Sequence, residues 1–568
     1  MDTFNILVVD DELRPREQSE QAFEDESKIK VYTAKNATEA TELINKHFFH
    51  VAYIDLQLER NDELKSKAKS NFDGKQVLNK LMTDRPSCKR YLLTYHPNSD
   101  SHYRTKFFDL LNPLDPMVHG AISKEEMHYN FTDIIRGQAM KYFEHPIKIN
   151  DTKKVYDKII EKYSDNNNIL VTEDEIDYIL SSMFGQNSFT QTGSNGDITN
   201  VELEFELLKG GRSRSIVFTG RPMNNLGNKG ILCVLKIGPR DSTMEEYRRY
   251  VKYVKFNLSQ NRRVETLGFF LADTLGVICY SFAGESPDKV KTLEELITAQ
   301  SNAVIPLIKA LFDPLKKEWY EKIGKSNDLA TYFFKLYNVN KDVSEKVIYP
   351  FIYKFSQDNN LTIKDKEFFY EMPINGCKLS LPKKEFIIRQ RGVYKECIVH
   401  GDLNAGNIII QADDKDENES HENLDNKIED HENVDISKAI LIDYMYTGIG
   451  PICMDFAALE SSVRLLSVRN ETDWKKIIPT IAIEKDTWKS AWGETKKDDN
   501  LPYWSKISKE LIRLCKLNFV DITQEEYART CLFWALRIVK IQMIKPIERL
   551  RLLIWISMLC DSLQIKNQ

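Results

Sequence analysis

Short apolar segments alternate with amphipathic segments along the first quarter of the chain. Five apolar runs have the character of buried β-strands: Phe4–Val9, Ile29–Thr33, His50–Ile54, Tyr91–Leu93 and Gly120–Ile122. Stretches with helical spacing lie between them, such as Ala37–Lys46 and Gly74–Met82. This alternation predicts an α/β domain over residues 1–145, built on a doubly wound, five-stranded parallel sheet.

Polar side chains stand where these predicted strands end. Asp10 and Asp11 follow the first strand, Asp55 ends the third, Thr94 ends the fourth and Lys124 follows the fifth. The carboxyl ends of parallel strands share one edge, where such sheets bind ligands, so we expect the five side chains to converge. Clustered carboxylates repel one another unless a hard cation such as Mg²⁺ neutralises them. A phosphoryl group at this edge would be stabilised by the metal, the ammonium and the hydroxyl.

Four segments in this order, ILVVDDE, AYIDLQL, LLTYHP and AISK, resemble the receiver domains of two-component response regulators. The resemblance implies that a sensor histidine kinase phosphorylates Asp55. It also implies that Asp10, Asp11 and Asp55 hold Mg²⁺, that Lys124 pairs with the phosphate and that Thr94 reports phosphorylation. The segments between Asp55 and Gly74 and between Thr94 and Lys124 are longer than usual, which alters the surface that a kinase or an output domain would contact.

Residues 146–200 are expected to link this domain to the rest of the chain. Helical spacing of Val155, Ile159 and Ile160 predicts one helix, and a second short helix is expected near Glu173–Met183. Both a signalling element that senses the receiver and a passive spacer fit this pattern.

A further series of strands begins at residue 201. The segments Val201–Leu208 and Ile216–Thr219 are predicted strands, and the turn between them contains Gly210, Gly211 and Ser213. Backbone N–H groups of such a turn can approach phosphate oxygens, although many such turns are plain hairpins.

Lys236 lies near the end of the next predicted strand, Gly230–Ile237, and Glu245 and Glu246 lie on the helix-like stretch that follows. A lysine on a strand and a glutamate on the next helix position nucleotide phosphates in kinases. Helix phase favours Glu246 as the partner of Lys236.

The segment HGDLNAGNIII, residues 400–410, is a polar loop that runs into an apolar strand. Asp402 can accept the proton of a substrate hydroxyl, and Asn407 can face a metal bound to phosphate. Asp443 follows the strand Ala439–Ile442 and can bridge Mg²⁺ to a nucleotide.

The set GGRSRS, VLKIGPRD, YSFAGES, HGDLNAGN and MDFAALE resembles the aminoglycoside-phosphotransferase and choline-kinase branch of the kinase superfamily. Within that branch it is most similar to a bacterial kinase-like domain described as ternary-complex-associated. The resemblance implies an α+β bilobal protein-kinase-like domain that binds ATP and Mg²⁺, with an N-lobe over residues 201–285 and a C-lobe over residues 286–568.

By the same resemblance, Asp402 is the catalytic base, Asn407 and Asp443 are Mg²⁺ ligands, and Lys236 and Glu246 form the phosphate-positioning pair. An insertion, residues 412–437, is acidic and has few apolar residues, so we expect it to be disordered.

The composition restricts the function further. The 568 residues carry a net charge of -6, and no helix-turn-helix-like basic segment follows the receiver, so a DNA-binding output is not expected. Nine cysteines without a C-x-x-C pair, together with the lack of a leader or a membrane span, favour a cytoplasmic protein.

The favoured function is a response regulator whose receiver is phosphorylated on Asp55 and controls an ATP- and Mg²⁺-dependent, kinase-like phosphotransferase domain. The sequence does not identify the acceptor of that domain. The alternative is a non-catalytic, nucleotide-binding scaffold that assembles partners in a phosphorelay or a bacterial defence pathway.

Overall fold

A computed structural model of the chain describes residues 3–56, 58, 73–94, 120–124, 133, 147–150, 152–164, 171–184, 201–207, 215–223, 230–284, 289–321, 324–326, 328–339, 342–412, 434–493 and 501–564. The chain forms two compact units. The first comprises Met1–Tyr247 and Thr266–Phe282, and the second comprises Arg248–Glu265 and Ala283–Gln568.

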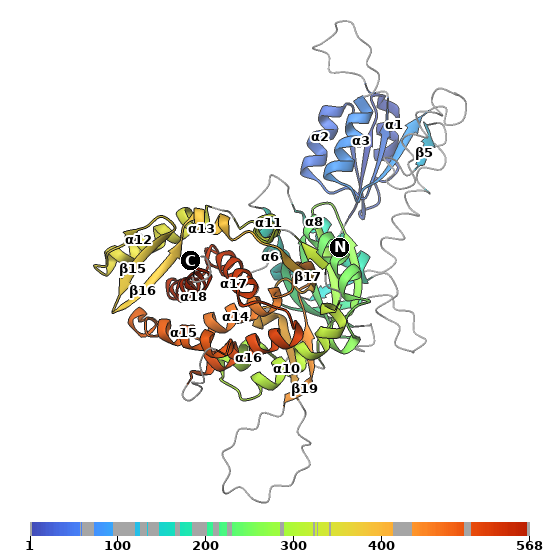
Figure 1. The fold of residues 1–568 in the computed structure, drawn as a ribbon. Helices are drawn as coiled ribbons and strands as arrows, with labels where there is room; N and C mark the ends of the chain where they lie inside the picture. Colours follow the sequence, from blue (N-terminus) through green and yellow to red (C-terminus); the bar gives the residue numbers. More distant parts are fainter. Residues whose placement is uncertain are drawn as a thin grey trace, which may run out of the picture. The chain divides into compact units, whose positions relative to one another are not determined.

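The N-terminal part of the first unit is a five-stranded parallel sheet with the strand order β2-β1-β3-β4-β5. Its strands are β1 (Phe4–Val9), β2 (Ile29–Ala34), β3 (Val51–Asp55), β4 (Lys89–Thr94) and β5 (Gly120–Ser123). The helices α1 (Leu13–Gln21), α2 (Ala37–Lys46) and α3 (Asp73–Asp84) lie beside it (Figure 1). The doubly wound parallel sheet predicted for this region is confirmed.

Alternate residues of β1 pack on opposite faces of this sheet. Leu7 and Val9 belong to a core that includes Ile44 of α2, whereas Ile6 and Val8 belong to a second core. Because helices and loops cover both faces, β1 is a continuous apolar run rather than an alternation of apolar and polar residues.

A second sheet in the same unit has six strands in the order β10-β11-β9-β8-β7-β6. They are β6 (Ile147–Asn150), β7 (Val201–Leu207), β8 (Ile216–Met223), β9 (Cys233–Pro239), β10 (Thr266–Leu271) and β11 (Leu275–Ser281). The helices are α6 (Thr152–Ser164), α7 (Glu173–Phe184) and α8 (Arg240–Arg249).

The expected boundary at residue 201 is therefore wrong as a structural division. β6 pairs in parallel with β7, so a strand from the supposed linker is part of the sheet. Apolar residues of α6 and α7, including Ile159 and Ile179, share one hydrophobic core with β8, β9 and β11. The two predicted helices exist, but they complete a domain instead of separating two.

The second unit contains three small sheets and most of the remaining helices. The sheets have the orders β12-β18-β19, β13-β17-β20 and β14-β15-β16. Their strands are β12 (Val290–Thr292), β13 (Gly324–Ser326), β14 (Lys364–Asp365), β15 (Phe369–Ile374), β16 (Cys377–Pro382), β17 (Tyr394–Val399), β18 (Ile408–Ala412), β19 (Val434–Leu441) and β20 (Gly448–Pro451).

Helices make up the larger part of this unit, and the last of them are orange and red in Figure 1. They are α9 (Leu293–Thr298), α10 (Val304–Leu315), α11 (Leu329–Leu336), α12 (Tyr349–Asp358), α13 (Lys384–Arg389), α14 (Met454–Leu466), α15 (Thr480–Ala491), α16 (Tyr503–Asn518), α17 (Gln524–Val539) and α18 (Pro546–Gln564). None of the helices in the described ranges is long and apolar enough to cross a membrane.

The insertion expected over residues 412–437 is shorter at both ends. Ala412 is the last residue of β18, and Val434 begins β19 and pairs with Ala412. Hairpin pairing of the two strands therefore continues into both ends of the segment. Residues 413–433 lie outside the described residues.

Candidate functional site

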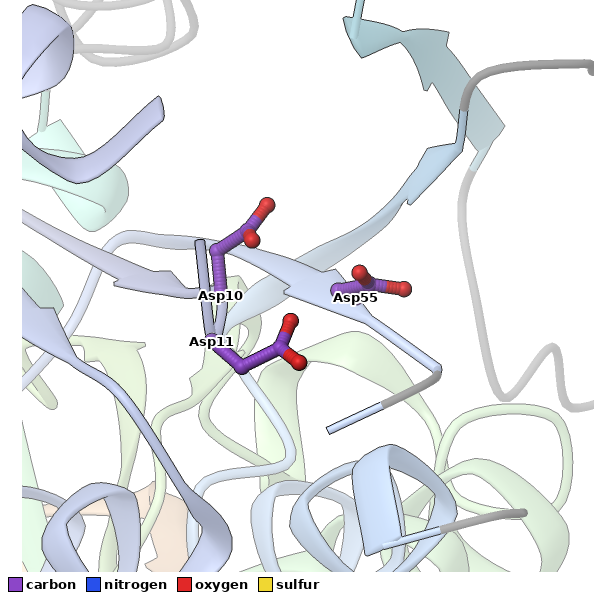
Figure 2. Close-up of side chains that lie close together, drawn as sticks. All are labelled: Asp10, Asp11 and Asp55. Carbon is purple, nitrogen blue, oxygen red and sulfur yellow. The ribbon is translucent and has the colours of Figure 1, made fainter. Parts of the chain in front are cut away.

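Three carboxylates converge at the carboxyl ends of the N-terminal strands. Asp10 and Asp11 follow β1, and Asp55 ends β3. Because the strands are parallel, their carboxyl ends lie at one edge of the sheet, where the three side chains meet (Figure 2). One ligand atom from each residue lies within 4.8 Å of the others. Asp10 is completely buried, whereas Asp55 retains 9% of its accessible surface.

Lys124, which follows β5, holds two of these carboxylates. Its Nζ lies 2.7 Å from Oδ2 of Asp55 and 2.9 Å from Oδ2 of Asp10. Burial alone would lower the pKa of Lys124, but the contacts with Asp55 and Asp10 raise it well above its usual value. The ammonium therefore remains charged and compensates part of the negative charge of the cluster.

The cluster keeps an excess of carboxylates. Burial raises the pKa of Asp10 to about 6, against the opposing effect of Lys124. The side-chain oxygens of Asp10, Asp11 and Asp55 are the donors that Mg²⁺ prefers, and their separation fits a shared cation. Within the part of the chain that the structure describes, this is the sole group of three or more acidic, histidine or cysteine side chains with such geometry.

The start of α3 approaches the backbone of Asp55 closely. A Cβ atom placed on Gly74 would lie 2.1 Å from the carbonyl oxygen of Asp55 and 2.6 Å from Cα of Leu56. Gly74 thus permits the helix to pack beside the acidic cluster. Thr94 is the last residue of β4, where the sequence predicts it, and the strand register pairs it with Ser123 of β5. The side chain of Thr94 lies outside the described residues.

A second pair of charges lies in the six-stranded sheet domain. Nζ of Lys236, on β9, lies 2.8 Å from Oε2 of Glu246 on α8, and both side chains are almost entirely buried. The hydroxyl of Tyr280 on β11 donates a hydrogen bond of 3.0 Å to Glu246. The structure thus places Glu246 against Lys236, as helix phase predicts. Gly210, Gly211 and Ser213 lie outside the described residues.

In the second unit, Asp402 lies in the loop between β17 and a short 3₁₀ turn, Ala405–Asn407. The side chain of Asn407 donates a hydrogen bond of 2.8 Å to the backbone carbonyl of Asp402. β18 and β19 pair with Ile408 opposite Leu441, and the backbone N–H of Ile442 donates to the carbonyl of Asn407. The pairing brings the backbone before β18 next to the segment that leads to Asp443.

A buried carboxylate holds this loop in place through hydrogen bonds to its backbone. Asp455, the second residue of α14, accepts hydrogen bonds of 3.0 Å from the backbone N–H groups of His400 and Gly401 and from the hydroxyl of Tyr320. Gly401 has φ 76, and a Cβ there would lie 2.3 Å from the carbonyl oxygen of Tyr446. Asp443 also has a positive φ of 65, a conformation that is strained for a residue other than glycine.

Sequence reasoning missed Arg537, which contacts Asp402 directly. Its Nη1 donates a hydrogen bond of 3.1 Å to Oδ1 of Asp402. The guanidinium also stacks 4.3 Å from the ring centres of Tyr337 and Trp534. Burial opposes the charge of Arg537, but Asp402 raises its pKa. The sequence signal was a single charged residue in the apolar segment CLFWALRIV of α17.

No family model and no curated protein matches this chain. Solved structures that match include a CheY-like receiver domain protein from Methanospirillum hungatei, with 20% identity, a TM-score of 0.19 and coverage of 24% of this chain and 93% of that one. Another is the response regulator TrrA from Thermotoga maritima in complex with Mg(2+)-BeF, with 22% identity, a TM-score of 0.18 and coverage of 24% and 98%. Similarity at this level does not by itself assign a function.

The order β2-β1-β3-β4-β5 in an all-parallel sheet is the doubly wound order found in flavodoxin and CheY, and its ligands bind at the carboxyl ends of the strands. The acidic cluster occupies that edge.

Proposed function

We propose that this chain is a two-component response regulator whose receiver accepts a phosphoryl group on Asp55. The observation that carries the proposal is the contact between Lys124 and Oδ2 of Asp55, within a cluster that also contains Asp10 and Asp11. A carboxylate, a paired ammonium and a cation-binding set are what an acyl phosphate site requires.

The residues have distinct roles in the proposed reaction. A carboxylate oxygen of Asp55 attacks the phosphorus of the donor, the bond from phosphorus to the donor breaks, and Asp55 becomes an acyl phosphate. Lys124 already contacts Asp55 and would neutralise the oxygens of the new phosphoryl group. Asp10 and Asp11 would hold Mg²⁺ with Asp55, and the metal would offset the charge of the incoming group. The physiological donor would be a sensor histidine kinase.

Phosphate transfer from acetyl phosphate in the presence of Mg²⁺ tests this proposal. We expect wild type to gain one acid-labile phosphate, measured by intact-protein mass spectrometry, and Asp55→Asn to gain none. The matched control is Asp25→Asn, which changes an exposed carboxylate of the same domain. Equal incorporation by wild type and Asp55→Asn would overturn the assignment of Asp55.

We further propose that the rest of the chain is a kinase-like output domain that binds ATP and Mg²⁺. The buried pair of Lys236 and Glu246 supports a phosphate-positioning role, since a lysine fixed by a glutamate offers a directed ammonium. Asp402 would be the base for a hydroxylated acceptor, and Asn407 and Asp443 would be the metal ligands. In this proposal the receiver controls the output domain.

One observation favours a second candidate, a nucleotide-binding scaffold without turnover. Arg537 donates a hydrogen bond to Oδ1 of Asp402 and places a guanidinium beside the oxygen that an acceptor hydroxyl would approach. Calorimetric ATP binding combined with a sensitive assay for ATP hydrolysis separates the candidates. Turnover that Asp402→Asn abolishes supports the kinase, and ATP binding without turnover supports the scaffold.

A further inference from the structure

The amino-end edge of the N-terminal sheet is buried against another part of the first unit. The residues at this edge precede or begin the strands: Asn5 in β1, Phe48 and His50 before β3, and Arg85 and Ser87 before β4. They contact α7 and the turn between β10 and β11. This surface lies at the opposite end of the strands from the acidic cluster.

Asp273, in the β10–β11 turn, is the centre of the contact. Its Oδ1 accepts a hydrogen bond of 3.0 Å from the backbone N–H of Ser87 and another from the hydroxyl of the same residue. Nη1 of Arg85 lies 3.7 Å from Oδ2. The side chain of Asp273 has no exposed surface, and a carboxylate buried in this way is costly unless it is hydrogen-bonded or paired. Its donors in this contact come from the N-terminal sheet domain.

Arg85 is itself held in place from the N-terminal domain. Its Nε and Nη2 donate hydrogen bonds of 3.1 Å and 2.9 Å to the carbonyl of Ile44 in α2. The guanidinium is therefore oriented before it meets Asp273, and little rotamer freedom is lost when the pair forms. A guanidinium that is already oriented toward a buried carboxyl group indicates a built contact and not an incidental one.

The first turn of α7 fixes the other side of the contact. Oε1 of Glu175 accepts hydrogen bonds from the backbone N–H groups of Thr274 and Leu275, at 2.6 Å and 3.1 Å. This anchors the β10–β11 turn to α7. The adjacent Asp174 accepts a hydrogen bond of 2.9 Å from the side chain of Asn5, so one helix turn joins both domains.

Aromatic rings fill the space beside these polar contacts. The ring of Tyr178 in α7 lies 5.2 Å from Phe48 and 5.5 Å from His50 on one side, and 5.4 Å from Phe270 of β10 on the other. Phe48 is completely buried and His50 is 6% exposed. Aromatic pairs at such distances add to the stabilisation that burial provides.

We propose that the amino-end edge of the receiver is an intramolecular docking surface whose partner is this chain's own α7 and β10–β11 turn. The receiver and the six-stranded sheet domain then open and unfold as one cooperative unit. The five residues of β3 separate this surface from Asp55 by roughly 13 Å, so a group bound at the acidic cluster does not compete for the docked residues.

Hydrogen exchange of the full chain, measured by mass spectrometry without any phosphoryl donor, tests this proposal. In wild type we expect peptides that contain β3 and peptides that contain α7 to open with the same free energy. Asp273→Ala should accelerate exchange in both by at least about 10-fold, because Ser87 and Arg85 lose a buried hydrogen-bond and ion-pair partner. Peptides of α14, in the second unit, should be unchanged. Asp241→Ala, an exposed carboxylate of α8, is the matched control.

A milder variant keeps the proposal testable if Asp273→Ala fails to fold. Ser87→Ala removes one hydroxyl donor from the receiver side and keeps the backbone donor. It should accelerate exchange in the same two sets of peptides, and it should add little in the Asp273→Ala background because the two side chains share one interaction. Unchanged exchange in Ser87→Ala, acceleration on one side only, or additive effects would each overturn the docking proposal. Since Asp55 is intact and no phosphate is used, failure here leaves the proposed phosphorylation untouched.

Discussion

The acidic cluster of the N-terminal domain and the Asp402 loop both hold a carboxylate against a cation, but their charges balance differently. At the cluster, the three carboxylates of Asp10, Asp11 and Asp55 lie together, and Lys124 pairs with two of them, Asp10 and Asp55. At the loop, Asp402 is paired with Arg537, whose guanidinium is further enclosed by aromatic rings. An excess of carboxylates calls for an additional cation, whereas a matched pair does not. The cluster is thus the better candidate for a metal-dependent acceptor.

The largest effect should follow from removing the cation of the cluster. Lys124→Met keeps most of the side-chain volume but leaves Asp10 and Asp55 uncompensated, which costs about 3–5 kcal/mol when a buried pair is broken. We expect the denaturation midpoint measured without Mg²⁺ to fall, and Mg²⁺ to restore part of the loss. Lys35→Met, an exposed lysine of the same domain, is the control. A Lys124→Met protein as stable as wild type without Mg²⁺ would show that the cluster does not need its lysine.

Replacement of the proposed base should affect turnover and spare nucleotide binding. Asp402→Asn should lower phosphotransfer or ATP hydrolysis by about 10²-fold, because a general base acts mainly in the transition state. ATP affinity measured by calorimetry should be retained. Asp486→Asn, an exposed carboxylate of α15, is the control. If Asp402→Asn turns ATP over as fast as an active wild type, another residue is the base.

The buried pair of the six-stranded sheet should matter for the nucleotide itself. Lys236→Ala removes a directed ammonium and should weaken ATP–Mg²⁺ binding by about 1–3 kcal/mol, the usual range for a charge-assisted hydrogen bond. Asp443→Ala should weaken it similarly. The measurement is isothermal titration calorimetry, with the exposed Lys475→Ala as control. Unchanged affinity in both variants would remove the nucleotide site from the proposal.

The smallest expected effect is the stabilisation of the folded wild-type protein by Mg²⁺ binding. At a concentration tenfold above its dissociation constant, Mg²⁺ should stabilise wild type by about 1.4 kcal/mol, since a ligand that binds only the folded state shifts unfolding by mass action. Asp11→Asn removes one ligand and should reduce this stabilisation. Thermal unfolding with and without Mg²⁺ measures it, and Asp25→Asn should respond like wild type. Equal stabilisation of Asp11→Asn would show that Asp11 is not a ligand.

The strands of the N-terminal domain and the positions of its polar residues were predictable because each depends on a short stretch of sequence. Phe4–Val9 is one uninterrupted apolar run, and it is followed at once by Asp10 and Asp11. Parallel strands carry their loop residues to a shared edge, so local order along the chain was sufficient to predict the convergence.

The contact between Asp402 and Arg537 was not predictable in this way. The two residues are far apart in the sequence, and Arg537 lies in an apolar helix where its charge has no local partner. The same holds for Asp273 and Arg85, whose pairing depends on how two domains fit together.

The division of the chain into domains shows the same limit. Two helices between residues 146 and 200 were predicted, but helical spacing does not reveal which surface a helix covers. The structure places apolar residues of α6 and α7 in the core of the six-stranded sheet and adds β6 to its edge. Burial of those faces required partners from distant parts of the chain, so the segment belongs to the domain that follows it.

The sequence by itself determined the strands and helices of the N-terminal domain and the order in which its acidic, hydroxyl and basic residues follow the strand ends. Hydrophobic periodicity and strand direction are local properties of the sequence. Helix phase favoured Glu246 as the partner of Lys236, but only the tertiary structure paired Lys124 with Asp10 and Asp55, Arg537 with Asp402, and Asp273 with Arg85. Burial makes each pairing important for stability, since a charge removed from water is costly unless an opposite charge or a hydrogen-bond partner lies nearby.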